Sequence, residues 1–262
     1  MADADFSRDN RSQVDSVIEA LFSDATHKFL SSAISREEGL FLQALASRPG
    51  IRATIEVGCG NGVSALYLCS GISSKENASH TAIDPFQSSE FQGRGIENIR
   101  RAGFNFFNLI EQPSEIALPR LLGNGARVDM ALIDGLHTAD QTLLDFYFLD
   151  RMINLGGIIV FDDVNSPAVN KIVRYVSTYP NYQLLGTSGH RGIRRRVING
   201  VKQCIAMSLW PIRKVLGEPL CREFWDISVI HSEMLWTIDF CTMAAFQKVG
   251  DYDRDTNWYR GI

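Results

Sequence analysis

Short apolar runs alternate with helical segments through the middle of the chain, and this pattern limits the possible folds more than any other feature. The expected strands lie in "ATIEVG", "HTAIDPF", "FFNLIEQ", "VDMALIDG" and "GIIVFDD". The helices between them are expected to begin near Val63, to cover about 90–102 and about 140–153, and to resume after Pro167. Such alternation predicts an α/β fold: a mainly parallel sheet with helices on both faces and a ligand crevice at the carboxyl ends of the strands.

Two further helices are expected before the first strand. Ser35 and Glu38 have the spacing of a capping box, which predicts that the second of these helices begins at Ser35. The first has apolar residues at helical spacing, namely Val14, Val17, Ile18, Leu21 and Phe22.

The composition excludes several classes of protein. With 262 residues, 45% of them apolar, the chain can bury a large core, and its net charge of −4 gives no case for nucleic-acid binding. No apolar run approaches the roughly 20 residues of a spanning helix, and the start "MADADFSRDN" does not resemble a signal peptide. The five cysteines form no CxxC pair, which argues against a disulfide scaffold or a thiolate zinc site. We therefore expect a cytoplasmic protein without stable membrane insertion.

A glycine-rich loop follows the first strand. Gly58, Gly60 and Gly62 alternate before a helix, and the glycines let the backbone approach a ligand closely. The N-terminus of the following helix offers free N–H groups to the same ligand. A dinucleotide fingerprint would require GxGxxG, and Val63 stands where its third glycine would be, which disfavours a nicotinamide dehydrogenase. A tight turn without any ligand is the alternative.

An acid ends the second strand. Asp84 lies 24 positions after Gly60, the separation at which such an acid accepts hydrogen bonds from ribose hydroxyls. Taken alone, the Asp84–Pro85 pair would more often be a turn.

Together, "TIEVGCGNGVSALYL" and "TAIDPF" resemble the first two motifs of class I S-adenosylmethionine (SAM)-dependent methyltransferases, over about 35–186. The resemblance implies a Rossmann-like, seven-stranded sheet. It also implies that the glycine loop holds the methionine part of the cofactor, that Asp84 holds the ribose, and that Ser114 and Glu115 lie beside the adenine. The full expected cofactor set is Glu56, Gly58, Cys59, Gly60, Asn61, Ser64, Asp84, Pro85, Ser114, Glu115 and Asp134.

Three carboxylates are expected to converge at neighbouring strand ends. Asp134 ends its strand 28 residues before Asp162, and Asp163 follows directly. Because unpaired carboxylates repel each other, a hard cation such as Mg²⁺, bound by Asp134, Asp162 and Asp163, would stabilise the group, with Asn165 as a further oxygen donor. The alternative is that Asp162 and Asp163 have a structural role in a solvated turn.

The motifs "IDGLH" and "DD" resemble the metal-dependent O-methyltransferases, both of the catechol type and of the sugar and natural-product type. The resemblance implies that the ion lowers the pKa of the acceptor hydroxyl and that His137 removes its proton. Asp134 or a metal-bound group is the alternative base, and His137 could also be bonded only to backbone.

The C-terminal part is less regular. Residues 190–217 contain basic residues and no acid, with an amphipathic helix expected in "VINGVKQCIAMSLW" as part of an insertion at about 190–220. This segment could be a lid or a subunit contact, an anion-binding surface, or a membrane-surface contact. We expect the closing strand or strands of the sheet in "WTIDFCTMAAFQKVG", and Phe224, Trp225, Trp236 and Trp258 either in an acceptor pocket or in the core. The basic residues are Arg191, Arg194, Arg195, Arg196, Lys202, Arg213 and Lys214.

The combined prediction is an enzyme that transfers a methyl group from SAM to a hydroxyl of a small molecule, a sugar or a phenolic natural product, with Mg²⁺. Residues 1–50 would form a cap on the acceptor side, and residues 51–262 the SAM-binding domain. The alternatives are a metal-independent methyltransferase and a non-catalytic cofactor-binding protein that docks a partner through its basic segment. A homodimer is a default expectation.

Overall fold

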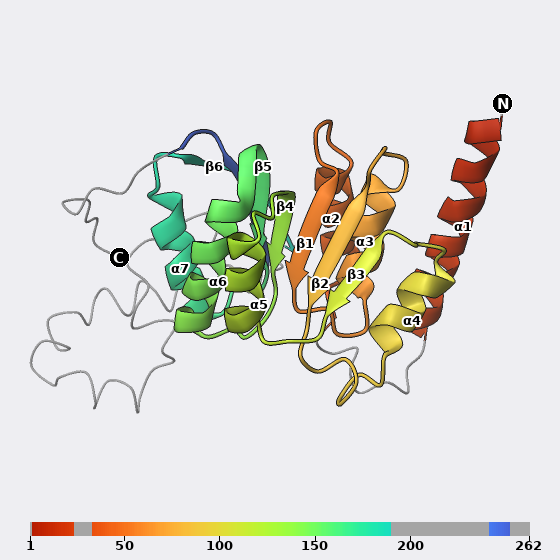
Figure 1. Ribbon diagram of the computed structural model, residues 1–262, viewed down its shortest axis with the longest axis horizontal. Coiled ribbons are helices and arrows are strands. Elements are labelled where there is room, and N and C mark those ends of the chain that lie inside the picture. The colour runs from red at the N-terminus through yellow and green to blue at the C-terminus, as the bar shows by residue number, and fades with distance from the viewer. Residues whose placement is uncertain (1, 24–32, 190–240, 252–262) are drawn as a thin grey trace, which may run out of the picture.

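A computed structural model describes residues 2–23, 33–189 and 241–251. Seven strands form one sheet in the order β3-β2-β1-β4-β5-β7-β6 (Figure 1). Neighbouring strands among β1 to β5 pair in parallel, whereas β7 is antiparallel to both β5 and β6. The mainly parallel, seven-stranded sheet is therefore confirmed. The strands are β1 (Ala53–Val57), β2 (Ser79–Ile83), β3 (Phe107–Ile110), β4 (Val128–Ile133), β5 (Ile153–Phe161), β6 (Tyr182–Ser188) and β7 (Met243–Lys248).

Helices cover both faces of the sheet, so that two hydrophobic cores form. On one face pack α1 (Ala2–Ser23), α2 (Arg36–Ala46), α3 (Val63–Ile72) and α4 (Arg94–Arg101). On the other face pack α5 (Ser114–Gly123), α6 (Ala139–Met152) and α7 (Pro167–Ser177), and Figure 1 shows α5 and α6 side by side.

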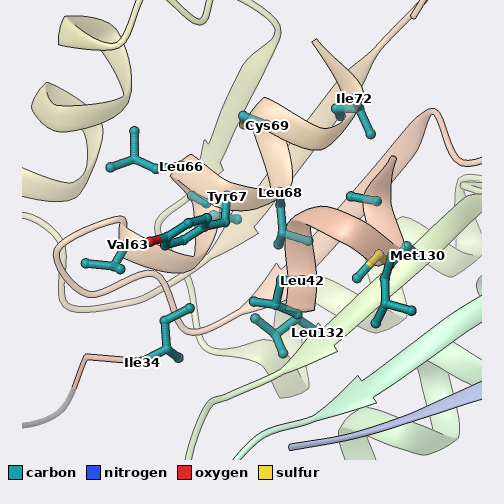
Figure 2. Packing of buried hydrophobic residues seen from close by; sticks show 14 of the residues in the cluster. Ile34, Leu42, Val63, Leu66, Tyr67, Leu68, Cys69, Ile72, Met130 and Leu132 are labelled. Atoms are coloured by element: carbon teal, nitrogen blue, oxygen red, sulfur yellow. The ribbon is translucent and has the colours of Figure 1, made fainter. Parts of the chain in front are cut away.

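The first core is dense where α2 and α3 cross the sheet. Leu42 of α2, Leu68 of α3 and Leu132 of β4 are all fully buried, and Figure 2 shows their side chains gathered together. Gly39 of α2 lies against the ring of Tyr67, where a Cβ would overlap the ring atoms. The absence of a side chain at Gly39 therefore allows α2 to lie directly on α3.

The element boundaries agree with the sequence in most places. The capping box is formed, since Ser35 Oγ accepts from Glu38 N at 3.3 Å and Ser35 N donates to Glu38 Oε2 at 2.6 Å. The helix expected over 90–102 is shorter, because Gln92 and Gly93 both have positive φ angles and the chain turns until α4 begins at Arg94.

The expected closing strand is β7, which lies within the predicted stretch. The basic segment 190–217, its expected helix, and Phe224, Trp225, Trp236 and Trp258 lie outside the described residues. Within the described part of the chain, no helix combines the length and hydrophobicity needed to cross a bilayer.

Candidate cofactor and acceptor site

A cavity of about 420 Å³ lies at the carboxyl ends of β1, β2 and β4. The strand order reverses between β1 and β4, and crevices of this kind in open α/β sheets are the usual ligand sites. Residues from the glycine loop, the end of β2, the start of α5 and the loop before α6 line the cavity. From the predicted cofactor set, the structure places Gly58, Cys59, Gly60, Asn61, Ser64, Asp84, Pro85, Ser114, Glu115 and Asp134 in its wall.

The glycine loop has a backbone that other residues could not easily adopt. Gly58 has φ +91, and a Cβ there would overlap the carbonyl oxygen of Asp134. Gly62 has φ +80, and its Cβ would lie 2.8 Å from the carbonyl oxygen of Gly95. The glycines are therefore needed both for the left-handed conformation and for close contact with neighbouring backbone.

Asp84 binds the loop from the end of β2. Its Oδ2 accepts hydrogen bonds from Cys59 N at 3.1 Å and Gly60 N at 2.8 Å, and its Oδ1 accepts from Phe86 N at 2.8 Å. Gln87 strengthens this link, because its Nε2 donates to both Asp84 Oδ2 and Gly60 O. Sequence reasoning missed Gln87, for which the polar position three residues after Asp84 was the available signal. The ribose role of Asp84 stays a prediction.

Glu56 lies behind the cavity wall. It is fully buried and outside the lining, and its Oε2 accepts a hydrogen bond from Ser64 Oγ at 2.7 Å. Its Oε1 lies 3.4 Å from Nε2 of the buried His80. The structure thus places Glu56 where it contacts the cavity through Ser64.

A second polar group at the cavity includes Ser114, the first residue of α5, and Gln141, in the first turn of α6. Gln141 Nε2 donates to Ser114 Oγ at 2.9 Å and to Asp145 Oδ1 at 3.1 Å, which joins α5 to α6. Asp145 is fully buried, and burial raises the pKa of its carboxyl to about 6. Neither Gln141 nor Asp145 was predicted, because a polar residue within an expected helix gives no sign of which way it faces.

His137 lies between two of the predicted carboxylates. Its Nε2 is 3.4 Å from Asp134 Oδ1 and its Nδ1 is 2.8 Å from Asp163 Oδ2. Hydrogen bonds to these two carboxylates raise the pKa of His137 to about 10, so the ring is a cation at neutral pH. Burial raises the pKa of Asp134 to about 6, whereas the hydrogen bond with His137 lowers the pKa of Asp163.

The predicted metal ligands do not form a metal site in this arrangement. Within the described residues, no group of three or more His, Cys, Asp or Glu side chains is placed to hold an ion. Asp134 lines the cavity, but Asp162 and Asp163 do not. Burial and the nearby Asp134 raise the pKa of Asp162 well above its usual value, and the His137 ring supplies positive charge to Asp134 and Asp163. These residues, as they lie, therefore do not fit Mg²⁺.

Residues 55–164, which contain strands β1 to β5 almost completely, match the family model described as "Methyltransferase domain". This part of the chain is similar to methyltransferase domains. The matched residues end directly after the carboxylate pair, so they include the glycine loop, Asp84 and the Asp134–His137 group.

Known proteins similar to this chain include a flavonoid 3',5'-methyltransferase from Vitis vinifera. It is 28% identical over 144 residues, which are 52% of this chain and 58% of the plant protein's length. Similar solved structures include the Bacillus cereus O-methyltransferase in complex with SAH, with a TM-score of 0.55 and 17% identity over 66% of this chain and 82% of that one. The O-methyltransferase TomG from Streptomyces achromogenes in complex with SAM has a TM-score of 0.53 and 18% identity over 66% of this chain and 80% of that one. The fold is therefore the Rossmann-like fold of class I methyltransferases.

Proposed function

We propose that the methyltransferase domain binds SAM and transfers its methyl group to a hydroxyl of a small molecule. The observation that carries the proposal is the single cavity wall that holds both the glycine loop with Asp84 and the Asp134–His137 pair. The cofactor would bind along the loop and the acceptor would bind beside Asp134. The SAH and SAM found in the two related structures support this choice of cofactor.

The reaction requires one proton to leave the acceptor. The hydroxyl oxygen forms a bond to the methyl carbon as the carbon–sulfur bond breaks, which leaves neutral S-adenosylhomocysteine (SAH). Asp134 is the better proton acceptor, because its pKa of about 6 leaves it ionised at neutral pH, whereas His137 is already protonated. The His137 cation would stabilise negative charge as it develops on the oxygen.

A phenolic acceptor suits this site better than a sugar. A phenol with a pKa of about 10, like that of tyrosine, gives up its proton more easily than an aliphatic hydroxyl. Apolar side chains at the cavity, Ile34, Phe86, Phe91 and Leu136, suit an aromatic ring. Ala33 and Ile34 belong to the N-terminal region, which supports the proposal that residues 1–50 form the acceptor side of residues 51–262.

Thermal unfolding with SAH tests the cofactor. A ligand at about 100 times its Kd adds roughly 2.7 kcal/mol to the free energy of unfolding. No stabilisation by SAH at any concentration would reject the proposal. Stabilisation without turnover of any phenol or sugar would indicate the non-catalytic alternative.

Kinetics of Asp134→Asn test the chemistry. We expect kcat to fall by about 10²-fold or more with SAH binding retained, and the wild-type kcat to fall as the pH is lowered through about 6. Asp140→Asn, at an exposed position on α6, is the matched control. Magnesium assistance, predicted from the sequence, would require His137 to leave its present position, and turnover that persists in EDTA would exclude it.

A further inference from the structure

The group formed by Gln141, Ser114 and Asp145 joins the start of α5 to α6 and has no role in the proton transfer proposed above. Gln141 is in the first turn of α6, where its backbone N donates to the capping hydroxyl of Thr138 at 3.4 Å. Ser114 is the first residue of α5. Both side chains line the cavity, and both are held by the starts of helices.

The orientation of the Gln141 amide is fixed by its partners. Both hydrogens of Nε2 are used, one toward Ser114 Oγ and one toward Asp145 Oδ1. A reversed amide would place its carbonyl oxygen against the Asp145 carboxylate, where two acceptors repel each other. Oε1 is therefore the polar atom of Gln141 that remains available, and no other described residue donates to it.

Holding the Gln141 amide with the carboxylate of Asp145 lowers the stability of the protein. It is fully buried, and its Oδ2 has no hydrogen-bond partner in the described part of the chain. Burying a carboxylate with one oxygen left without a partner costs free energy, so the position would be more stable with a neutral side chain. An ionised carboxylate, however, can only accept hydrogen bonds, and it therefore enforces one amide orientation.

We propose that Gln141, oriented by Asp145 and Ser114, recognises the 6-amino group of the cofactor's purine through Oε1. The inference rests on the proposed function, since it requires an adenine-containing cofactor in this cavity. An exocyclic amino group donates a hydrogen bond to Oε1. A 6-oxo purine would instead present an acceptor to an acceptor, and would be rejected. Gln141 is thus a specificity-determining residue, and Asp145 is a positioning residue that acts through it.

The test compares the Kd of SAH with that of S-inosylhomocysteine, its 6-oxo analogue, by calorimetry on the full chain. We expect the wild-type protein to bind SAH at least about tenfold more tightly than the analogue, the factor that one favourable hydrogen bond gives. In Gln141→Met, which has a similar shape but no hydrogen-bonding amide, we expect the ratio to approach one. In Asp145→Asn the new amide can donate to Oε1 and let Gln141 reverse, so the ratio should fall there too.

Gln112→Met is the control, because Gln112 lies outside the cavity lining and its side chain accepts a hydrogen bond from Arg120. This variant should keep the wild-type ratio. A merely structural role would weaken both ligands equally, so an unchanged ratio in Gln141→Met would overturn the inference. If the wild-type protein binds neither ligand, the proposed function itself fails, which is a different result from SAH binding without discrimination.

Discussion

Asp145 gives the folded protein a dependence on pH that a neutral residue would remove. Burial raises the pKa of its carboxyl from 3.8 to about 6, so between these values the folded state binds more protons than the unfolded state. The free energy of unfolding therefore falls as the pH rises through this window, and the penalty is complete above about pH 6. We expect Asp145→Asn to raise the free energy of unfolding at pH 7.5 by on the order of 2 kcal/mol. Denaturant unfolding at several pH values measures this.

The gain in Asp145→Asn should shrink toward pH 4.5. The exposed Asp140 is the control, because its hydrogen bond with Thr138 lowers its pKa, and Asp140→Asn should give no such gain. A stability difference in Asp145→Asn that is the same at all pH values would contradict the assigned cause.

Substitution of Gly58 tests whether the glycine loop needs its observed backbone conformation. We expect Gly58→Ala to lower the free energy of unfolding by about 2 kcal/mol or more and to abolish SAH binding, because alanine is strained at φ +91 and its Cβ would overlap Asp134 O. Urea unfolding and calorimetry measure the two effects. Gly123→Ala is the matched control, since a Cβ there meets no atom within 4 Å. Normal SAH binding in Gly58→Ala would show that the loop can rearrange.

Individual site residues could be predicted where they belong to a local sequence motif. Gly58, Gly60 and Asp84 follow from spacing alone, and all of them line the cavity. Gln87, Gln141 and Asp145 could not, because their importance depends on which distant atoms they meet after folding. The predicted Mg²⁺ ligands were placed near each other by the strand ends, as expected. The sequence did not predict, however, that the His137 ring would lie between Asp134 and Asp163.

The start of α2 is marked by a capping box. Ser35 Oγ accepts the Glu38 N–H, and the carboxylate of Glu38 in turn accepts from Ser35 N and from Thr242 Oγ1. We expect Ser35→Ala to lower the free energy of unfolding by about 1 kcal/mol, the usual value for a lost cap. Thermal or urea unfolding measures the change.

Ser166→Ala provides the comparison for α2. Ser166 occupies the same cap position at the start of α7, but its side chain makes no capping hydrogen bond. The substitution there should change stability by much less. Equal effects at the two positions would mean that cap preference, rather than the hydrogen bond, determines the loss.

The boundaries of the elements were predictable where side chains mark them. The capping box located α2, and Gly62 before Val63 located α3. The predicted start of α4 was wrong, because the chain turns at Gln92, which has φ 54. Glutamine rarely adopts this conformation, so the sequence does not predict the turn.

Across the whole molecule, Lys248 joins the last described strand to the middle of the chain. Its buried Nζ donates to the backbone oxygen of Asp150 at 2.8 Å and lies 3.8 Å from that residue's carboxylate. We expect Lys248→Met to lower the free energy of unfolding by about 2 kcal/mol or more, because it removes a buried donor from the carbonyl oxygen and leaves the carboxylate with Arg151, at 4.0 Å, as its nearby cation. Lys171→Met, at an exposed position on α7, should be nearly neutral, and denaturant titrations of the two variants compare them directly. Equal losses would mean that the buried cation has no special role.

The parallel direction of β1 to β5 was predictable from alternation, because each parallel connection needs its own helix, although the order of these strands in the sheet was not predicted. The position of β7 was not predictable either, since an antiparallel strand can join an edge of the sheet or lie between two other strands. Its insertion between β5 and β6 is set by pairing that only the folded chain shows.

The position of β7 also has a consequence for the order of events during synthesis. The ribosome makes β5 and β6 long before residues 243–248, yet these residues are the neighbour that each of those strands needs. Until they emerge, the growing polypeptide presents an open strand edge on β5, a surface that readily pairs with another chain. A chaperone that shields nascent chains would therefore matter most during the interval between translation of β6 and translation of β7.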